Sequence, residues 1–271
     1  MLRLILIALL LVQSAEARPR YDEHLLPENS IYTDINFRLA LFGGKPGKDF
    51  EHYVDYEENV ARVLHDVFAF DVVARVIAYP SFEPEFATAL ELKEGKYKIL
   101  HLEPSVQLLH YEELEILREN SDSDSQNEEL LEYLQFLEFE QIELPETREN
   151  VKVSQCEIPI SNALGIKLYS LWGEMLFRTR YPNLPEATPE TKPAFINSGI
   201  DGTRYHFSFE YPGFTLAGNI WQPRATSITG KFVRISTLMK EACRAENNEN
   251  VLTELERRVG ELNAALAEAG N

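Results

Sequence analysis

Several sequence signatures of catalysis are missing from this chain of 271 residues. It contains no Gly-x-Ser-x-Gly nucleophile elbow, no His-Glu-x-x-His zinc motif and no Cys-x-x-Cys pair. Its six histidines are scattered, and no two are spaced to share one face of a helix. We therefore expect no metal site and no cofactor, and no motif indicates a particular reaction.

Basic residues are also scarce, because 26 lysines and arginines stand against 44 acidic residues and give a net charge of −18. Nucleic acids and anionic lipids bind basic surfaces, so we expect neither as a partner. The charge is uneven along the chain: fourteen acidic and two basic residues lie between residues 110 and 150, whereas residues 161–240 have a small basic excess. We interpret 110–150 as an acidic, solvated surface insertion, with a cation or partner site as the alternative.

Long apolar runs are absent beyond the first residues of the chain, so we expect no membrane span. Arg3, the apolar run 4–12 and the small-x-small sequence Ala15-Glu16-Ala17 form the pattern of a secretory signal peptide over residues 1–17. No Asn-x-Ser/Thr glycosylation site is present. These features favour export to a bacterial periplasm or to the medium.

Cysteine occurs only twice, as Cys156 and Cys243. In an oxidising compartment the two could form a disulfide, which would stabilise the protein by about 4 to 5 kcal/mol by closing a long loop. The alternative is two separate buried thiols, since free cysteine is often a core residue.

The clearest element is a strand that begins near Thr203, between the turn dipeptides Asp201-Gly202 and Pro212-Gly213. Side chains alternate along it with period two, which is typical of a half-buried strand. The aromatic face holds Tyr205, Phe207, Phe209 and Tyr211, and the polar face holds Arg204, His206, Ser208 and Glu210. We predict that the aromatic face looks inward and that a sheet is built around this strand.

The remaining patterns predict an α+β fold with an antiparallel-dominated sheet, helices mainly on one side and a C-terminal helix. Further strands are expected at 35–41, 70–79, 87–92, 97–102 and 151–160, and helices at 50–68, 128–139, from Ser161 to before Pro182, and 231–244. Residues 111–118 fit either a strand or a helix, and 120–127 is expected to be a loop. In the helix at 128–139, Leu130, Leu131, Leu134 and Leu137 are expected to face inward. The predicted division is an α+β domain at 18–245 and an amphipathic helix at 246–271.

The apolar seam of that last helix, from Leu252 to Ala269, steps by three and four residues. It predicts docking onto the body of the protein or, as the alternative, a homodimer through residues 250–269.

One candidate catalytic site is Glu83 with Glu85, two carboxylates two residues apart at the end of a buried strand. Arg178 or Arg180 could stabilise charge beside them. The alternative is a rigid loop whose carboxylates cap backbone amides or pair with these arginines.

A candidate binding site is the polar face of the central strand, with Arg204 and His206 near Trp221. A half-exposed sheet face with aromatic residues could bind a sugar or a peptide. The alternative is an ordinary solvent-facing strand surface.

Three stretches together resemble a group of exported bacterial proteins that have no assigned activity. They are Pro80-Ser81-Phe82-x-Pro84-Glu85, Arg178-Thr179-Arg180-Tyr181-Pro182 and Asp201-Gly202-Thr203-x-Tyr205-x-Phe207. The resemblance covers residues 68–243 and implies a bacterial source, but no ligand or catalytic residue.

We therefore expect an exported binding or interaction protein without catalysis, whose partner is an envelope protein, a peptide or a glycan. One alternative is a hydrolase of an envelope glycan or peptide that uses Glu83 and Glu85. The other is an assembly protein that dimerises through its last helix.

Overall fold

The computed structural model describes residues 25–27, 48–119, 124–145, 150–180 and 202–269. The expected signal peptide and the expected strand at 35–41 lie outside these residues.

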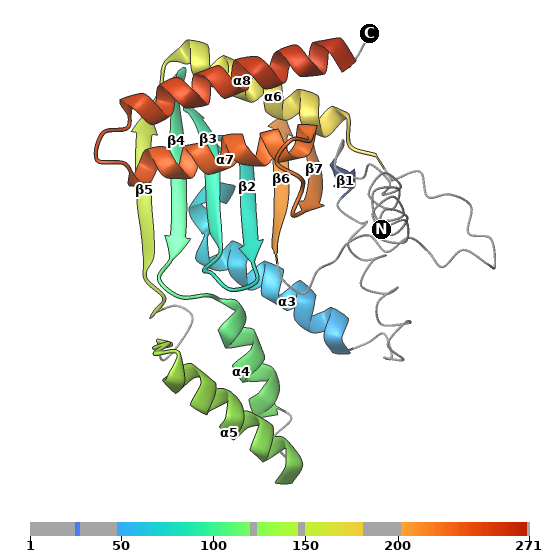
Figure 1. Cartoon of the computed structure of the whole chain (residues 1–271), viewed down its shortest axis with the longest axis vertical. Helices are drawn as coiled ribbons and strands as arrows, with labels where there is room; N and C mark the ends of the chain where they lie inside the picture. The colour runs from blue at the N-terminus through green and yellow to red at the C-terminus, as the bar shows by residue number, and fades with distance from the viewer. Residues whose placement is uncertain (1–24, 28–47, 120–123, 146–149, 181–201, 270–271) are drawn as a thin grey trace, which may run out of the picture.

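A single seven-stranded sheet, antiparallel throughout, forms the centre of the molecule, with the strand order β1-β7-β6-β2-β3-β4-β5 (Figure 1). Its strands are β1 (Leu26–Pro27), β2 (Val72–Pro80), β3 (Phe86–Lys93), β4 (Lys96–Pro104), β5 (Val153–Pro159), β6 (Thr203–Tyr211) and β7 (Phe214–Trp221). The hairpin connection between β3 and β4 places Glu94 and Gly95 at positive φ. The expected antiparallel α+β fold is confirmed.

The aromatic strand predicted from the sequence is β6, which lies between β2 and β7. Phe207 and Phe209 are fully buried in the core, as expected from the alternation. Tyr205 is only half-buried, and Tyr211 is 47% exposed because it lies at the turn between β6 and β7. The aromatic face is therefore buried in its middle and emerges into solvent at its end.

Helices cover both faces of the sheet, with three of them on one face (Figure 1). These three are α6 (Asn162–Phe177), α7 (Ile228–Arg244) and α8 (Glu249–Ala269). The opposite face carries α3 (Lys48–Val63) and the short 3-10 helix η2 (His65–Phe68). Helices thus lie mainly on one side, as predicted. None of the helices in the described part of the chain is long and apolar enough to cross a membrane.

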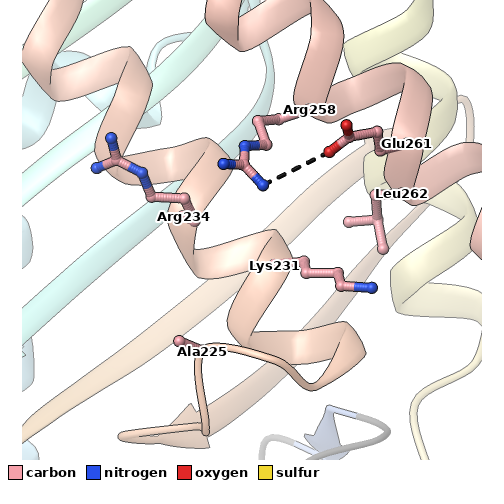
Figure 2. A pocket seen from close by; sticks show the side chains of 6 residues that line it. All are labelled: Ala225, Lys231, Arg234, Arg258, Glu261 and Leu262. Carbon is pink, nitrogen blue, oxygen red and sulfur yellow. Dashed lines mark hydrogen bonds and ion pairs between the residues drawn. The ribbon is translucent and has the colours of Figure 1, made fainter.

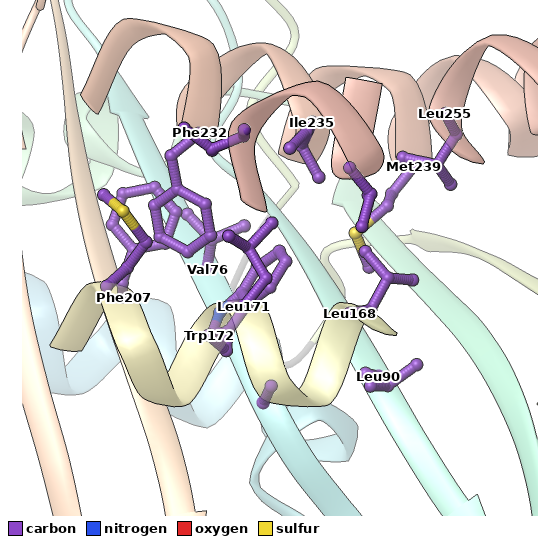
Figure 3. Packing of buried hydrophobic residues seen from close by; sticks show 14 of the residues in the cluster. Val76, Leu90, Leu168, Leu171, Trp172, Phe207, Phe232, Ile235, Met239 and Leu255 are labelled. Carbon is purple, nitrogen blue, oxygen red and sulfur yellow. The ribbon is translucent and has the colours of Figure 1, made fainter. Parts of the chain in front are cut away.

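The larger core lies between the sheet and helices α6 and α7 (Figure 3). Phe232 of α7 stacks on Phe207 of β6 with a centroid separation of 4.4 Å, and Trp172 of α6 meets Phe232 edge-on at 4.6 Å. Aromatic pairs of this kind contribute beyond the area they bury. Helix α6 approaches the sheet so closely that a Cβ at Gly165 would lie 2.1 Å from the ring of Tyr97. These contacts hold helices α6 and α7 to the sheet and to each other.

A second core lies on the other face, where Tyr56 and Val60 of α3 and Leu64, which follows α3, pack against the sheet. This layer corrects the prediction for the polar face of β6. Arg204 and Ser208 are buried instead of solvent-facing, because α3 and η2 cover part of this face. The sequence of β6 alone could not show this, since α3 lies far away along the chain.

Helix α8 packs against α7 and α6, and its seam residues Leu255, Val259, Leu262 and Leu266 are at most 2% exposed. The seam is therefore occupied within the chain. A homodimer through the same residues would require α8 to leave the body.

Two helices form an insertion between β4 and β5, whose ends pair with each other at Pro104 and Val153. They are α4 (Leu109–Glu119) and α5 (Asp124–Phe139), and we call residues 109–139 the α4–α5 arm. Figure 1 shows the arm extending beyond the end of the sheet, away from α6, α7 and α8. Residues 111–118 are therefore helical. The expected loop at 120–127 is wrong in its second half, because α5 begins at Asp124.

The prediction for the leucines of α5 is also wrong in part. Leu137 is 6% exposed and Leu130 is half-buried, but Leu131 is 57% and Leu134 is 40% exposed. The helix has apolar residues on more than one side, and α4 covers only one of these sides.

Candidate functional site

Glu83 and Glu85 do not form a pair, because Glu83 is exposed and Glu85 is fully buried. The carboxylate of Glu85 accepts hydrogen bonds from the Tyr56 hydroxyl and from the backbone amides of Leu108 at 2.8 Å and Leu109 at 3.2 Å. Burial raises the pKa of Glu85 above its ordinary value, and these hydrogen bonds partly oppose that rise. The amides belong to the first turn of α4 and the residue before it, so Glu85 caps this helix.

Arg204 lies on the same side of the sheet and is also engaged internally. Its guanidinium forms an ion pair with Glu57 of α3 at 2.5 Å and lies over the ring of Tyr79 at 4.4 Å from the centroid. Burial raises the pKa of the Tyr79 hydroxyl, and the Glu57 carboxylate adds to this effect. The cluster fastens α3 to the sheet.

His206 and Trp221 are half-buried and lie on the same face as Arg204, since Arg204 is directly opposite Trp221 in the sheet. Arg204, His206 and Trp221, the residues of the predicted binding site, therefore gather on the face covered by α3.

Arg178 and Arg180 lie instead at the end of α6, which packs on the opposite face. Arg178 donates to Glu174 Oε1 at 2.7 Å and to the Leu266 carbonyl at 3.0 Å, so it joins α6 to the end of α8. The backbone amide of Arg180 donates to the Leu25 carbonyl at 3.2 Å. The arginines expected to support Glu83 and Glu85 therefore do not meet them.

A pocket of about 260 Å³ lies between α7 and α8 and is lined by Ala225, Lys231, Arg234, Arg258, Glu261 and Leu262 (Figure 2). The basic side chains do not converge on it. Figure 2 shows Lys231 and Arg234 extending in opposite directions, and Arg258 pairing with Glu261. Arg234 is bound to both carboxylate oxygens of Glu241. The pocket therefore offers no focused positive charge to a ligand.

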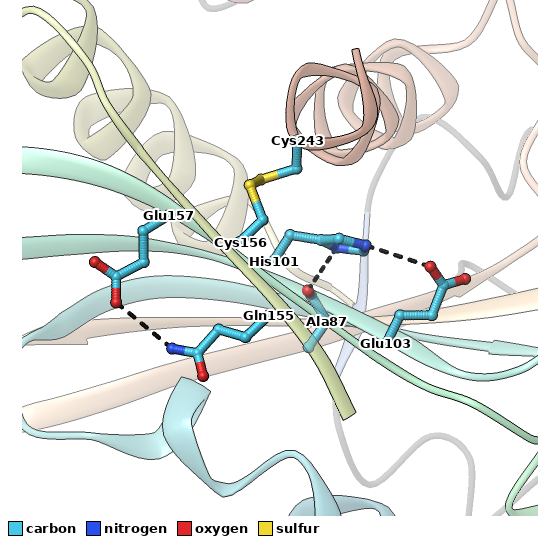
Figure 4. The surroundings of a disulfide bond; sticks show 7 residues. All are labelled: Ala87, His101, Glu103, Gln155, Cys156, Glu157 and Cys243. Atoms are coloured by element: carbon cyan, nitrogen blue, oxygen red, sulfur yellow. Dashed lines mark hydrogen bonds and ion pairs between the residues drawn. A yellow bond between two sulfur atoms is a disulfide. The ribbon is translucent and has the colours of Figure 1, made fainter. Parts of the chain in front are cut away.

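The structure pairs Cys156 of β5 with Cys243 of α7 in a disulfide, with their Cα atoms 5.8 Å apart (Figure 4). His101 lies opposite Cys156 on β4, and its Nδ1 is 3.0 Å from the Ala87 carbonyl. Its Nε2 is 3.5 Å from Glu103, whose carboxylate also accepts hydrogen bonds from Lys240 at 3.2 Å and from Arg244.

The protonation states of His101 and Glu103 follow from their burial and from the charges beside them. The pKa of His101 is lowered to about 4, mainly by burial; the Glu103 carboxylate opposes this effect and the Lys240 ammonium adds to it. Burial alone would raise the pKa of Glu103, but the hydrogen bonds from Arg244 and Lys240 outweigh it and lower that pKa. Within the described residues, no three His, Cys, Asp or Glu side chains are arranged to hold a metal ion.

The α4–α5 arm differs from all of these clusters because it presents apolar side chains to solvent. Among its described side chains only Leu114 and Leu137 are buried. Four large apolar residues of α5 are exposed, namely Leu131 (57%), Leu134 (40%), Phe136 (42%) and Phe139 (82%). We call these four residues the α5 apolar strip.

Hydrogen bonds fix the arm at its base and within itself. The Glu85 cap holds the start of α4, and Gln107 donates to the Pro80 carbonyl at 3.0 Å. Tyr111 donates to the Pro145 carbonyl at 2.8 Å, and His110 Nδ1 lies 2.8 Å from the Tyr133 hydroxyl. The arm is therefore fixed to the sheet at its base, and α5 is fixed to α4.

Comparisons with protein-family models, with curated proteins and with solved structures find no match for this chain. The candidate site therefore depends on the geometry alone.

Sequence reasoning missed the α5 apolar strip because it assigned the leucines of α5 to the core. The missed signal is that α5 has apolar residues on more than one side, while all its charged residues are acidic.

Proposed function

We propose that this protein is an exported binding protein that acts without catalysis and contacts its partner through the α4–α5 arm. The observation that supports this most strongly is the α5 apolar strip, whose most exposed member is Phe139 at 82%. Helices with apolar residues all round are normally covered, so an uncovered side indicates a surface that another molecule fills.

The polar groups that suggested a hydrolase have internal roles. Glu85 caps α4 without access to solvent, and Arg178 bridges α6 and α8. Dimerisation through α8 has less support than binding through the arm, because the apolar seam of α8 is buried within its own chain.

Site-specific photocrosslinking can test the proposal. A photoreactive phenylalanine analogue is placed at residue 139 on the arm and, in a matched variant, at residue 82 on the Pro80–Glu85 loop. The two positions are similarly exposed, at 82% and 76%, so they sample solvent equally well. Irradiation of cells that produce the protein should give a distinct adduct from position 139 and none from position 82.

The reverse pattern, with an adduct from position 82 only, would move the binding site to the loop of the hydrolase hypothesis. Adducts from neither position would contradict a function through the arm. Fractionation of the same cells tests export, which requires the adduct in the envelope or the medium.

A further inference from the structure

The charge of the arm limits what can cover the α5 apolar strip. Helix α5 contains five carboxylates and no lysine or arginine, and no basic residue lies in its last turn. The carbonyl groups at a helix C-terminus add partial negative charge at the same end. Glu138, Glu140 and Glu143 are all exposed there, next to Phe139. Exposed apolar side chains and exposed carboxylates therefore alternate around the uncovered side of α5.

A segment that complements this surface must bring apolar side chains and positive charge together. We propose that the α5 apolar strip docks a cationic amphipathic helix of a partner protein, with apolar residues against the strip and Lys or Arg side chains against the carboxylates. This inference rests on the proposed function and names the chemistry of the partner. An exposed α-helix of 16 residues is about 24 Å long, so a partner helix of similar length can cover it.

Other occupants fit the charge less well. A second copy of the chain would bring a second acidic segment, with fourteen acidic and two basic residues, against the first. Like charges at an interface oppose association, and an anionic bilayer is repelled for the same reason. Residues 161–240 of the body differ from the arm in having a basic excess. Charge complementarity therefore favours a basic partner protein.

Purified full-length protein and designed peptides can test this inference directly. The probe is a fluorescent 16-residue Leu/Lys peptide with leucines at helical spacing. One control peptide has the same composition but a permuted order that destroys the apolar stripe, and the other replaces each Lys by Glu. Fluorescence anisotropy should show saturable binding of the Leu/Lys helix, with at least about tenfold weaker binding of both controls.

Variants of the protein locate the binding surface. Replacing Leu131 and Phe139 by Gln should weaken binding of the Leu/Lys peptide at least about tenfold. The matched variant Ile166→Gln, on an exposed residue of α6, should leave binding unchanged. Replacing Glu138, Glu140 and Glu143 by Gln should weaken binding and reduce its dependence on salt, because screening acts on the charged contacts. The matched variant Glu246→Gln, also at an exposed position, should do neither.

Circular dichroism and thermal unfolding of each variant ensure that a loss of binding is not a loss of fold. Equal binding of the Leu/Glu and Leu/Lys peptides, or binding that no arm variant changes, would overturn the inference.

Concentration-dependent dimerisation that Leu131→Gln and Phe139→Gln abolish would overturn it in favour of a second copy. Binding to phosphatidylglycerol vesicles through the same residues would overturn it in favour of a membrane. An adduct from position 139 without binding of the Leu/Lys peptide would refute this inference alone, whereas the absence of both would refute the proposed function as well.

Discussion

The body of the protein and the α4–α5 arm use the same kinds of residue in opposite ways. In the body, Trp172, Phe207 and Phe232 are less than 2% exposed, and charged groups such as Arg204 and Glu103 have partners within the chain. In the arm, large apolar residues are exposed, and the acidic side chains of α5 have no basic residue on their own helix. The buried clusters of the body have thus satisfied their interactions internally, whereas α5 exposes four large apolar residues along a single helix.

The largest expected effect concerns the bridge between Cys156 and Cys243, which belongs to the body. The cysteines are 87 residues apart in sequence, and the arm lies outside the loop that they close. Reduction should lower the free energy of unfolding by about 4 kcal/mol, because it releases the unfolded chain from this constraint. Urea unfolding with and without dithiothreitol measures the change. The variant Cys156→Ala/Cys243→Ala should resemble the reduced protein and show no response to dithiothreitol; an unchanged midpoint in the reduced protein would contradict the prediction.

A smaller loss is expected where the arm joins the body, at Glu85. The substitution Glu85→Gln should lower the free energy of unfolding by roughly 2 kcal/mol, since the side-chain nitrogen of Gln is itself a donor and leaves without a partner a buried donor from which one carboxylate oxygen now accepts. The matched substitution Glu83→Gln should change it by less than about 0.5 kcal/mol, because Glu83 is exposed.

Urea unfolding gives both values, and hydrogen exchange should speed up at the amides of Leu108 and Leu109 only in Glu85→Gln. Equal stability of the two variants would show that Glu85 does not anchor the arm.

The third effect is a pH dependence in the body, at His101. Its pKa is about 4 in the folded protein and about 6.5 in an unfolded chain, so the unfolded state takes up a proton first as the pH falls. The contribution of His101 to the free energy of unfolding is therefore complete above pH 6.5 and decreases as the pH falls towards 4. Between pH 7 and pH 5 the loss should reach about 2 kcal/mol.

The neighbouring charges make the comparison with His101→Gln necessary. Glu103 and Lys240 both face His101, and the raised pKa of Glu85 acts in the opposite direction, adding stability as the pH falls. The difference in unfolding free energy between the protein and His101→Gln, measured at pH 7 and pH 5, isolates the histidine. A difference that stays constant over this range would show that His101 is not held neutral by burial.

The sequence predicted the body better than the arm, for reasons that particular residues make clear. Alternation identified β6 because each side chain of a strand belongs to one of two faces, and Phe207 and Phe209 are buried accordingly. It could not reveal that α3 covers Arg204, nor that the amides capped by Glu85 lie more than twenty residues along the chain, at Leu108 and Leu109. Such contacts depend on the tertiary arrangement.

Helix α5 also shows that burial depends on the tertiary arrangement and not on the sequence pattern alone. Its apolar residues at helical spacing predicted a buried face, but which face is buried depends on the position of α4. Leu137 faces the inside of the arm and Leu131 faces solvent, although both follow the same pattern in sequence.

The smallest expected effect on stability separates the buried side of α5 from its exposed side. Leu131→Gln should change the free energy of unfolding by less than about 0.5 kcal/mol, because this residue is 57% exposed and the substitution removes little buried surface. The matched substitution Leu137→Gln should cost about 2 kcal/mol or more, since Leu137 is 6% exposed and a buried amide lacks a partner there. Urea unfolding at pH 7 compares the two. An exposed Leu131 that contributes little stability leaves its side chain available for the partner contact that we propose. If Leu131→Gln instead destabilised the protein as much as Leu137→Gln, the strip would be part of the core of the arm, and the argument for a docking surface would fail.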